Sequence, residues 1–243
     1  MAPSWLTERP YAHRGLHGRG TGIPENSLAG FEAAIAGGYG IELDVQETRD
    51  GEPVVFHDYE LSRLTNEKGR VAGRSLSEME QLTLKNSDQR VASLAHVLET
   101  VAGRTPILIE VKTRKWKVGR LEAAVARVVS AYSGPAAVMS FNIRSVVWFK
   151  KHAPDLTRGL VATTMRYGGR DQPASVAYLP LSTSMKRCGA AFLAYDLRVL
   201  PTAETIDLRR RGTPVLTWTV KRPEDREKAE RVADAMIFEG WTP

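Results

Sequence analysis

The stretch Gly40-Ile41-Glu42-Leu43-Asp44-Val45 carries the pattern from which the fold can be worked out. Apolar and acidic residues alternate in it, which is the period of a β-strand, so the Glu42 and Asp44 side chains project side by side from one face. Neighbouring carboxylates repel each other and resist burial unless a cation, basic side chains or water compensates them. Taken alone, the stretch is typical of an edge strand with a solvated acidic face. The surrounding chain must decide between that interpretation and a cation site.

A regular alternation of strand and helix patterns extends from this stretch. Helix patterns begin near residues 27, 93, 118, 142, 174, 203 and 223, between strand patterns at 11–15, 40–45, 106–112, 136–141, 158–162, 191–196, 213–220 and 235–240. Strands that alternate with helices in this number predict a parallel sheet closed into a (β/α)8 TIM barrel. An open, doubly wound sheet is the competing architecture, but the glycines after the first strand do not fit the G-x-G-x-x-G spacing of a dinucleotide-binding turn.

The barrel pattern is interrupted after the second strand. The turn Asp50-Gly51 leads to an extended run at 53–57, which we expect to form a hairpin arm beside that strand. Residues 59–92 are polar and irregular, with a short helix pattern at 76–82, and predict a small insertion. A length of 243 residues suits one large α/β domain, so we expect residues 1–243 to form a single domain that contains this insertion.

Composition and charge argue against several classes of protein. No apolar run approaches the roughly 20 residues that cross a bilayer, and residues 1–10 lack the apolar core of a signal peptide. The single cysteine, Cys188, excludes an internal disulfide framework and fits a reducing compartment, so we expect a cytoplasmic protein. The net charge is +6, but the basic residues are scattered and not interleaved with aromatic ones. This distribution argues against nucleic acid and favours an anionic substrate.

Polar residues interrupt the apolar strands at their carboxyl ends, where a TIM barrel carries its active site. The first three strands contribute His13 with Arg14, Glu42 with Asp44, and Glu110 with Lys112. His57 ends the hairpin arm and can fold back over the end of the second strand, and Asp196 follows the sixth strand. Because these residues come from separate strands and reach the same rim, they predict one site.

The residue types at this rim indicate a reaction. Glu42, Asp44 and Glu110 offer oxygen ligands, which suit Mg²⁺ or Ca²⁺, and zinc held through histidine is the weaker alternative. His13 and His57 can serve as acid and base near neutral pH. Arg14 and Lys112 supply fixed positive charge, as a phosphodiester requires, although neutralising the carboxylates is an alternative role for both. Together the residues predict metal-assisted cleavage of a phosphoester.

With these residues at these positions, the chain resembles the glycerophosphodiester phosphodiesterase family. The matching stretches are His13-Arg14-Gly15, Pro24-Glu25-Asn26-Ser27, Glu42-Leu43-Asp44-Val45 with Thr48 and Asp50-Gly51, Val54 to Asp58, Leu61 with Arg63 and Thr65, Glu110-Val111-Lys112, and Trp218-Thr219-Val220. The resemblance spans nearly the whole chain. It implies a TIM barrel with an insertion after the second strand and a small-molecule glycerophosphodiester as substrate.

The resemblance also implies roles for individual residues. Glu42, Asp44 and Glu110 would bind a divalent cation, and His13 and His57 would act as general base and general acid. Arg14 and Lys112 would hold the phosphate, with Glu25 and Trp218 as further candidates for substrate contact. A glycerol hydroxyl would attack the phosphate first, and water would then open the cyclic phosphate to release glycerol phosphate and an alcohol.

Two stretches depart from the family pattern. The last strand ends in Phe238-Glu239-Gly240-Trp241-Thr242-Pro243 rather than Thr-Asp-x-Pro, and Lys221 follows Trp218-Thr219-Val220 where many members have Asn. Both lie at the rim that would face the alcohol or the glycerol, so the sequence connects them with substrate choice.

Two other functions remain open to the sequence. One is phospholipase D-like cleavage of lysophospholipids or sphingolipids, for which Phe238, Trp241 and the segment 163–189 would have to offer an exposed apolar surface. The other is a barrel that binds phosphate esters without catalysis, although such proteins typically lose a histidine or a carboxylate that is present here. The sequence leaves the oligomeric state undetermined.

Overall fold

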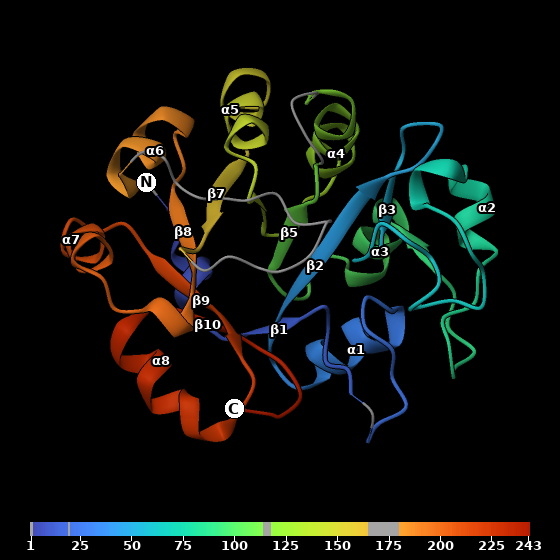
Figure 1. The fold of residues 1–243 in the computed structure, drawn as a ribbon, viewed down its shortest axis with the longest axis horizontal. Helices are drawn as coiled ribbons and strands as arrows, with labels where there is room; N and C mark the ends of the chain where they lie inside the picture. Colours follow the sequence, from blue (N-terminus) through green and yellow to red (C-terminus); the bar gives the residue numbers. More distant parts are fainter. Residues whose placement is uncertain (1, 19, 114–117, 165–179) are drawn as a thin grey trace.

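The computed structural model describes residues 2–18, 20–113, 118–164 and 180–243, and in these residues the chain forms a closed parallel barrel (Figure 1). The neighbouring strands run in the order β1, β10, β9, β8, β7, β6, β5 and β2, and a further pairing of β1 with β2 closes the ring. The barrel strands are β1 (Tyr11–His13), β2 (Gly40–Glu47), β5 (Ile107–Val111), β6 (Ala136–Ser140), β7 (Thr157–Ala162), β8 (Phe192–Asp196), β9 (Val215–Val220) and β10 (Ala235–Phe238). The predicted (β/α)8 TIM barrel is confirmed.

Helices surround the strands on the outside of the ring, as Figure 1 shows. They are α1 (Leu28–Ala36), α3 (Leu94–Val101), α4 (Arg120–Ser130), α5 (Ile143–His152), α6 (Leu181–Cys188), α7 (Ala203–Arg210) and α8 (Arg226–Val232). Ser93 and Asn142 cap α3 and α5 as expected, because each side chain accepts a hydrogen bond from a backbone N–H of the first turn. Residues 174–179 of the helix predicted from residue 174 lie outside the described residues.

The insertion after β2 lies beside the barrel rather than within it (Figure 1). The hairpin arm is β3 (Pro53–Val55), which pairs antiparallel with β2 and with the short β4 (Ala92–Ser93). The predicted short helix is α2 (Leu76–Glu80), and its capping box at Ser75 and Glu78 explains where it begins. The insertion packs on β3 through a cluster of buried apolar residues: Val54, Phe56, Leu61, Val71, Met79, Leu84 and Val91.

Side chains from alternate strand positions fill the interior of the barrel. Phe192 lies there against Gly159 of the neighbouring strand, where a Cβ would approach the Phe192 ring to 2.3 Å, so that only glycine leaves room for the ring. Leu6, from the segment before β1, packs with the same interior cluster. Among the described residues, the helices are too short or too polar for any of them to cross a membrane.

Candidate active site

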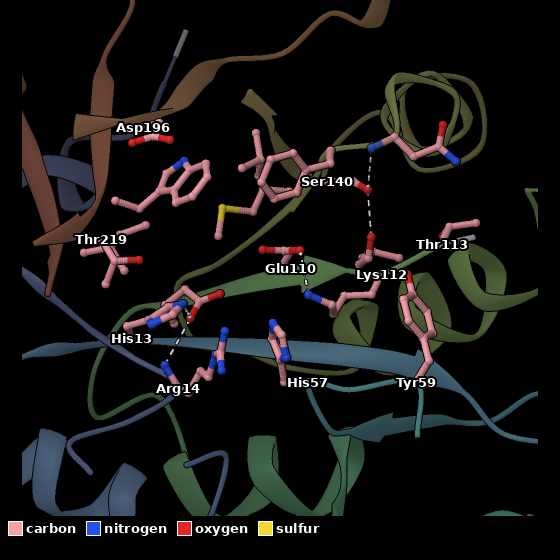
Figure 2. Close-up of a pocket in the computed structure, with 18 of the residues that line it drawn as sticks. His13, Arg14, His57, Tyr59, Glu110, Lys112, Thr113, Ser140, Asp196 and Thr219 are labelled. Atoms are coloured by element: carbon pink, nitrogen blue, oxygen red, sulfur yellow. Dashed lines mark hydrogen bonds and ion pairs between the residues drawn. The ribbon is translucent and has the colours of Figure 1, made fainter. Parts of the chain in front are cut away.

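The carboxyl ends of the barrel strands surround a cavity of about 380 Å³. Figure 2 shows His13, Arg14, His57, Glu110 and Lys112 gathered around its centre. Most residues predicted for the site line this cavity: His13, Arg14, Glu42, His57, Glu110, Lys112, Asp196 and Trp218. Parallel strands end at the same rim, so residues up to about 200 positions apart in the chain converge there.

Three carboxylates lie together at the base of the site. Glu42 and Asp44 project from the same face of β2, and the register of β2 with β5 places Asp44 beside Glu110. One oxygen from each of the three lies within 4.8 Å of the others. Glu42 and Asp44 are each 1% exposed. This stretch is therefore not an edge strand with a solvated acidic face, because both carboxylates are buried.

Electrostatics separates the two carboxylates of β2. Burial, with repulsion from Asp44 and Glu110, raises the pKa of Glu42 well above its usual range. Burial also opposes ionisation of Asp44, but Lys112, His57 and Arg14 outweigh it and hold the pKa of Asp44 well below its usual range. Glu42 is the carboxylate of the group that most needs a further positive charge.

Arg14 and Lys112 hold the carboxylate cluster from two sides. Arg14 Nε lies 3.3 Å from Asp44 Oδ2, and Lys112 Nζ lies 3.4 Å from both Asp44 Oδ1 and Glu110 Oε1. Burial lowers the pKa of Lys112, but Glu110 and Asp44 more than offset it and raise that pKa, so the ammonium stays charged. Both side chains line the cavity, so neutralising the carboxylates and facing a ligand are compatible roles.

An unusual turn positions Arg14. Arg14 has φ +56° and Gly15 φ +82°, which turns the Arg14 N–H toward Glu42 Oε2 at 3.0 Å. A Cβ at position 15 would lie 2.9 Å from the Gly30 backbone, so the tight return of the chain onto α1 requires glycine. The sequence His13-Arg14-Gly15 therefore orients a backbone donor as well as two side chains.

Asn26 is part of the site in a way that the sequence analysis did not assign. Ser27, the next residue, caps α1 with its side chain. Asn26 has φ +54°, donates from Nδ2 to Asp44 Oδ2 at 3.0 Å and accepts from the Asp44 N–H at 3.3 Å. This pair of hydrogen bonds holds Asp44 in one orientation, so Asn26 positions one carboxylate of the cluster.

Each histidine is held at Nδ1 by a carboxylate. His13 Nδ1 lies 2.6 Å from Glu239 Oε2, and His57 Nδ1 lies 2.6 Å from Asp58 Oδ1. An ionised carboxylate only accepts, so each ring donates from Nδ1 and, when neutral, keeps its acceptor at Nε2. His13 Nε2 faces the carboxylate cluster, 3.8 Å from Glu42 Oε2.

The environment of His13 favours its neutral form. Burial and the neighbouring Arg14 lower the pKa of His13 to about 4, and the hydrogen bond with Glu239 opposes that shift only in part. Burial opposes ionisation of Glu239, but its interactions with His13 and Lys221 together outweigh burial and hold the pKa of that carboxyl well below its usual range. The pair is thus a neutral imidazole on an ionised carboxylate.

Glu25 lies behind Arg14 and is held by two arginines. It accepts from Arg14 Nη1 at 2.8 Å and from Arg63 Nη1 and Nη2 at 2.7 and 2.8 Å. Burial opposes its ionisation, but Arg63 and Arg14 outweigh burial and lower the pKa of Glu25 to about 2. Arg63 also donates to Asp58. This arginine of the insertion therefore contacts both the carboxylate that holds Arg14 and the carboxylate that holds His57.

Trp218 and the end of the last strand complete the rim. Trp218 lines the cavity and packs edge-on against Phe141, with ring centroids 5.3 Å apart. Phe238 is 1% exposed, and the Trp241 indole N–H donates to the Val220 carbonyl at 2.9 Å. Neither forms the exposed apolar surface that a lipid substrate would need, because both pack inward; residues 165–179 lie outside the described part of the chain.

Comparisons with known proteins identify the family to which the chain is similar. The model of the glycerophosphoryl diester phosphodiesterase family matches residues 13–239. The chain is 30% identical to a glycerophosphodiester phosphodiesterase of Caldanaerobacter subterraneus, over 89% of this chain and 87% of the relative. It is 33% identical to a putative glycerophosphodiester phosphodiesterase of Bacillus subtilis, over 90% of this chain and 88% of the relative.

Solved structures with the same fold include a phosphodiesterase and a putative phosphodiesterase. A phosphodiesterase of Oleispira antarctica, solved in complex with the product sn-glycerol-3-phosphate, superposes with a TM-score of 0.81 at 23% identity, covering 96% of this chain and 93% of that one. A putative glycerophosphoryl diester phosphodiesterase of Silicibacter pomeroyi has a TM-score of 0.79 at 25% identity, covering 95% of this chain and 89% of that one.

Proposed function

The chain belongs to the glycerophosphoryl diester phosphodiesterase family and is an enzyme of this class, and on that premise we propose that its hydrolysis of glycerophosphodiesters depends on a divalent cation and on acid–base catalysis by His13 and His57. The products are glycerol phosphate and an alcohol. The observation that carries the proposal is the convergence, in one cavity, of a cluster of three carboxylates with two histidines that are each held by a carboxylate.

The donors of the cluster fit a hard divalent cation. Glu42, Asp44 and Glu110 supply only oxygen, which is the ligand type of Mg²⁺ and Ca²⁺. The ion pairs that join the site connect the carboxylates of Glu25, Glu42, Asp44, Asp58, Glu110 and Glu239 with the basic groups of Arg14, Arg63, Lys112 and Lys221. With the histidines left aside and every carboxylate counted as ionised, these groups carry two more negative than positive charges, which a divalent cation would balance. The bound cation would stabilise negative charge on the phosphate oxygens.

The two histidines would divide the proton transfers. His13, with its pKa lowered to about 4, is neutral near pH 7 and suits the general base that takes a proton from the attacking oxygen at Nε2. His57, held at Nδ1 by Asp58, suits the general acid that gives a proton to the leaving alcohol oxygen. The attacking oxygen is a glycerol hydroxyl in the first step and water in the second.

The remaining site residues would bind and orient the substrate. Arg14 and Lys112 border the cavity beside the carboxylate cluster, where they would hold the phosphate. Glu25 would act on the substrate by keeping Arg14 in place, and Trp218 would form the wall beside the glycerol or the alcohol. The single cysteine, which is buried, agrees with action in the cytoplasm, which we also propose.

The test is turnover on a panel of glycerophosphodiesters with and without EDTA, followed by addition of Mg²⁺ or Ca²⁺. We expect release of glycerol phosphate that EDTA abolishes and one or both cations restore. His13→Ala and His57→Ala should lower kcat by at least about a hundredfold, whereas His96→Ala, an exposed histidine on α3, should leave it unchanged. Full activity in EDTA-dialysed protein, or near-normal turnover in either histidine variant, would sink the proposal.

A further inference from the structure

The two positions at which this chain departs from the family pattern meet in the folded protein. Lys221 follows β9 and Glu239 follows β10, and Lys221 Nζ lies 3.1 Å from Glu239 Oε1. The other oxygen of the same carboxylate, Oε2, is the one that accepts from His13 Nδ1 at 2.6 Å. Glu239 therefore has one oxygen on a lysine and the other on the histidine.

The backbone places these two side chains together. The Glu239 N–H donates to the Val220 carbonyl at 3.0 Å, and the Trp241 indole donates to the same oxygen at 2.9 Å. Val220 directly precedes Lys221, so these two hydrogen bonds tie the end of β10 to the end of β9. The contact between Lys221 and Glu239 thus follows from the register of two paired strands, not from the free motion of two long side chains.

We propose that Glu239 and Lys221 form a positioning pair that holds the His13 ring with Nε2 toward the reacting phosphate. Glu239 sets the ring tautomer, because a carboxylate accepts only from a protonated Nδ1. Lys221 holds Glu239 by its second oxygen, so that the carboxylate keeps its orientation toward His13. The proposal rests on the proposed function in assigning catalysis to His13, and it adds two residues that act through it.

A positioning pair and a substrate contact make different predictions for Lys221. Lys221 also lines the cavity, so a direct contact with substrate would appear as a raised KM when the ammonium is removed. A positioning role appears as a lowered kcat with KM nearly unchanged, because the ring is misplaced only for proton transfer. The Lys221 side chain is 61% exposed, so removing its ammonium should cost little stability, and the change in kcat or KM can be measured on folded protein.

The experiment is a double-mutant cycle of Glu239→Gln and Lys221→Met, assayed on the glycerophosphodiester that the wild-type enzyme cleaves best. We expect Glu239→Gln to lower kcat about tenfold to a hundredfold with KM within about twofold, as for groups that orient a functional histidine. Lys221→Met should lower kcat by a smaller factor, about threefold to tenfold, and should have no further effect once Glu239 is replaced. Glu239→Asp should recover part of the loss, and Glu227→Gln, an exposed carboxylate on α8, is the matched control.

Nitrogen spectra of the histidine rings test the same proposal without an activity assay. At about pH 8, His13 should carry its proton on Nδ1 in the wild-type protein and show a mixture of tautomers in Glu239→Gln; the signal is assigned by its loss in His13→Ala. The proposal is overturned if Glu239→Gln leaves both kcat and the His13 tautomer unchanged, if Lys221→Met acts on KM alone, or if the two losses multiply. If the wild-type protein cleaves no glycerophosphodiester, the proposed function fails, and the spectra still decide whether the pair positions His13.

Discussion

Replacing Glu42 by glutamine should make the melting temperature of this barrel nearly independent of divalent cations. Glu42 is 1% exposed and lies with Asp44 and Glu110 in a group whose ligand oxygens are within 4.8 Å of one another. Glutamine keeps the length of the side chain and an oxygen that can accept from the Arg14 N–H, as Glu42 does at 3.0 Å. The substitution therefore removes a charge and a cation ligand with little change in packing.

The magnitude follows from mass action and from the size of the chain. A cation at about 100 times its dissociation constant stabilises the folded state by about 2.7 kcal/mol. For a chain of 243 residues, about 1 kcal/mol raises Tm by roughly 2–4 °C, so the wild-type protein should gain about 5–10 °C. In Glu42→Gln the same cation concentration should raise Tm by less than about 2 °C, because one of three charged ligands is gone.

Without a cation, Glu42→Gln should be at least as stable to heat as the wild-type protein. Burial and the neighbouring carboxylates raise the pKa of Glu42, so its ionised form destabilises the folded state as the pH rises through that pKa. At pH 7 in EDTA, Glu42→Gln should therefore melt at the same temperature as the wild type or higher. A functional carboxylate would then cost stability in the absence of its cation.

The assay is thermal unfolding of the EDTA-dialysed proteins, followed by titration with Mg²⁺ and with Ca²⁺. Glu227→Gln, an exposed carboxylate on α8, is the control for loss of a negative charge and should respond to cations as the wild type does. The reasoning is refuted if no divalent cation raises the wild-type Tm, or if Glu42→Gln keeps the full cation response. If metal-free Glu42→Gln melts well below the wild type, the charge of Glu42 does not destabilise the metal-free protein.

Three further predictions concern the supports of the site. Arg63→Met removes the contacts to Glu25 and Asp58 and should lower kcat about tenfold, while Arg70→Met, an exposed arginine of the same insertion, should not; equal rates for both would contradict the role of Arg63. The pKa of Glu25, lowered from 4.5 to about 2, contributes roughly 3 kcal/mol of stability above pH 4.5 that is lost as the pH falls toward 2. Denaturant unfolding at several pH values should show this loss in the wild type and a smaller one in Glu25→Gln, and parallel curves would count against it. Gly15→Ala, with φ +82° and a Cβ 2.9 Å from the Gly30 backbone, should destabilise the fold by about 2 kcal/mol or more in denaturant unfolding, and an unchanged midpoint would show that the turn relaxes freely.

The barrel could be predicted because its signals are local. Each strand appears in the sequence as a short apolar run, and each helix as apolar residues at helical spacing. The number of strands and their parallel direction could therefore be predicted from the sequence. The ends of the elements were predicted less closely: the helix expected from residue 118 begins at Arg120, and of the adjacent polar residues Asn26 and Ser27 it is Ser27 that caps α1. Caps depend on which of two adjacent polar residues has extended backbone geometry, and the composition of the segment does not decide that.

The groups that support the site were mostly out of reach of the sequence. Asp58 stands next to His57 in the chain, and that adjacency was a signal that could have been used. Glu239 is 226 residues from His13, and a carboxylate so far away carries no local mark of its partner. Its departure from the family pattern pointed to substrate choice, whereas the structure places it against the histidine.

The sequence by itself determined the parallel barrel, the rim where the polar residues end their strands, and the types of group available for the reaction. A side-chain period of two and the parallel direction of the strands are sufficient for these conclusions. Only the tertiary structure decided how deeply Glu42 and Asp44 are buried, which carboxylate holds which histidine, and that Lys221 meets Glu239. These depend on distances between strands that are remote in the chain, and such distances are set by closure of the barrel and not by any residue's neighbours in sequence.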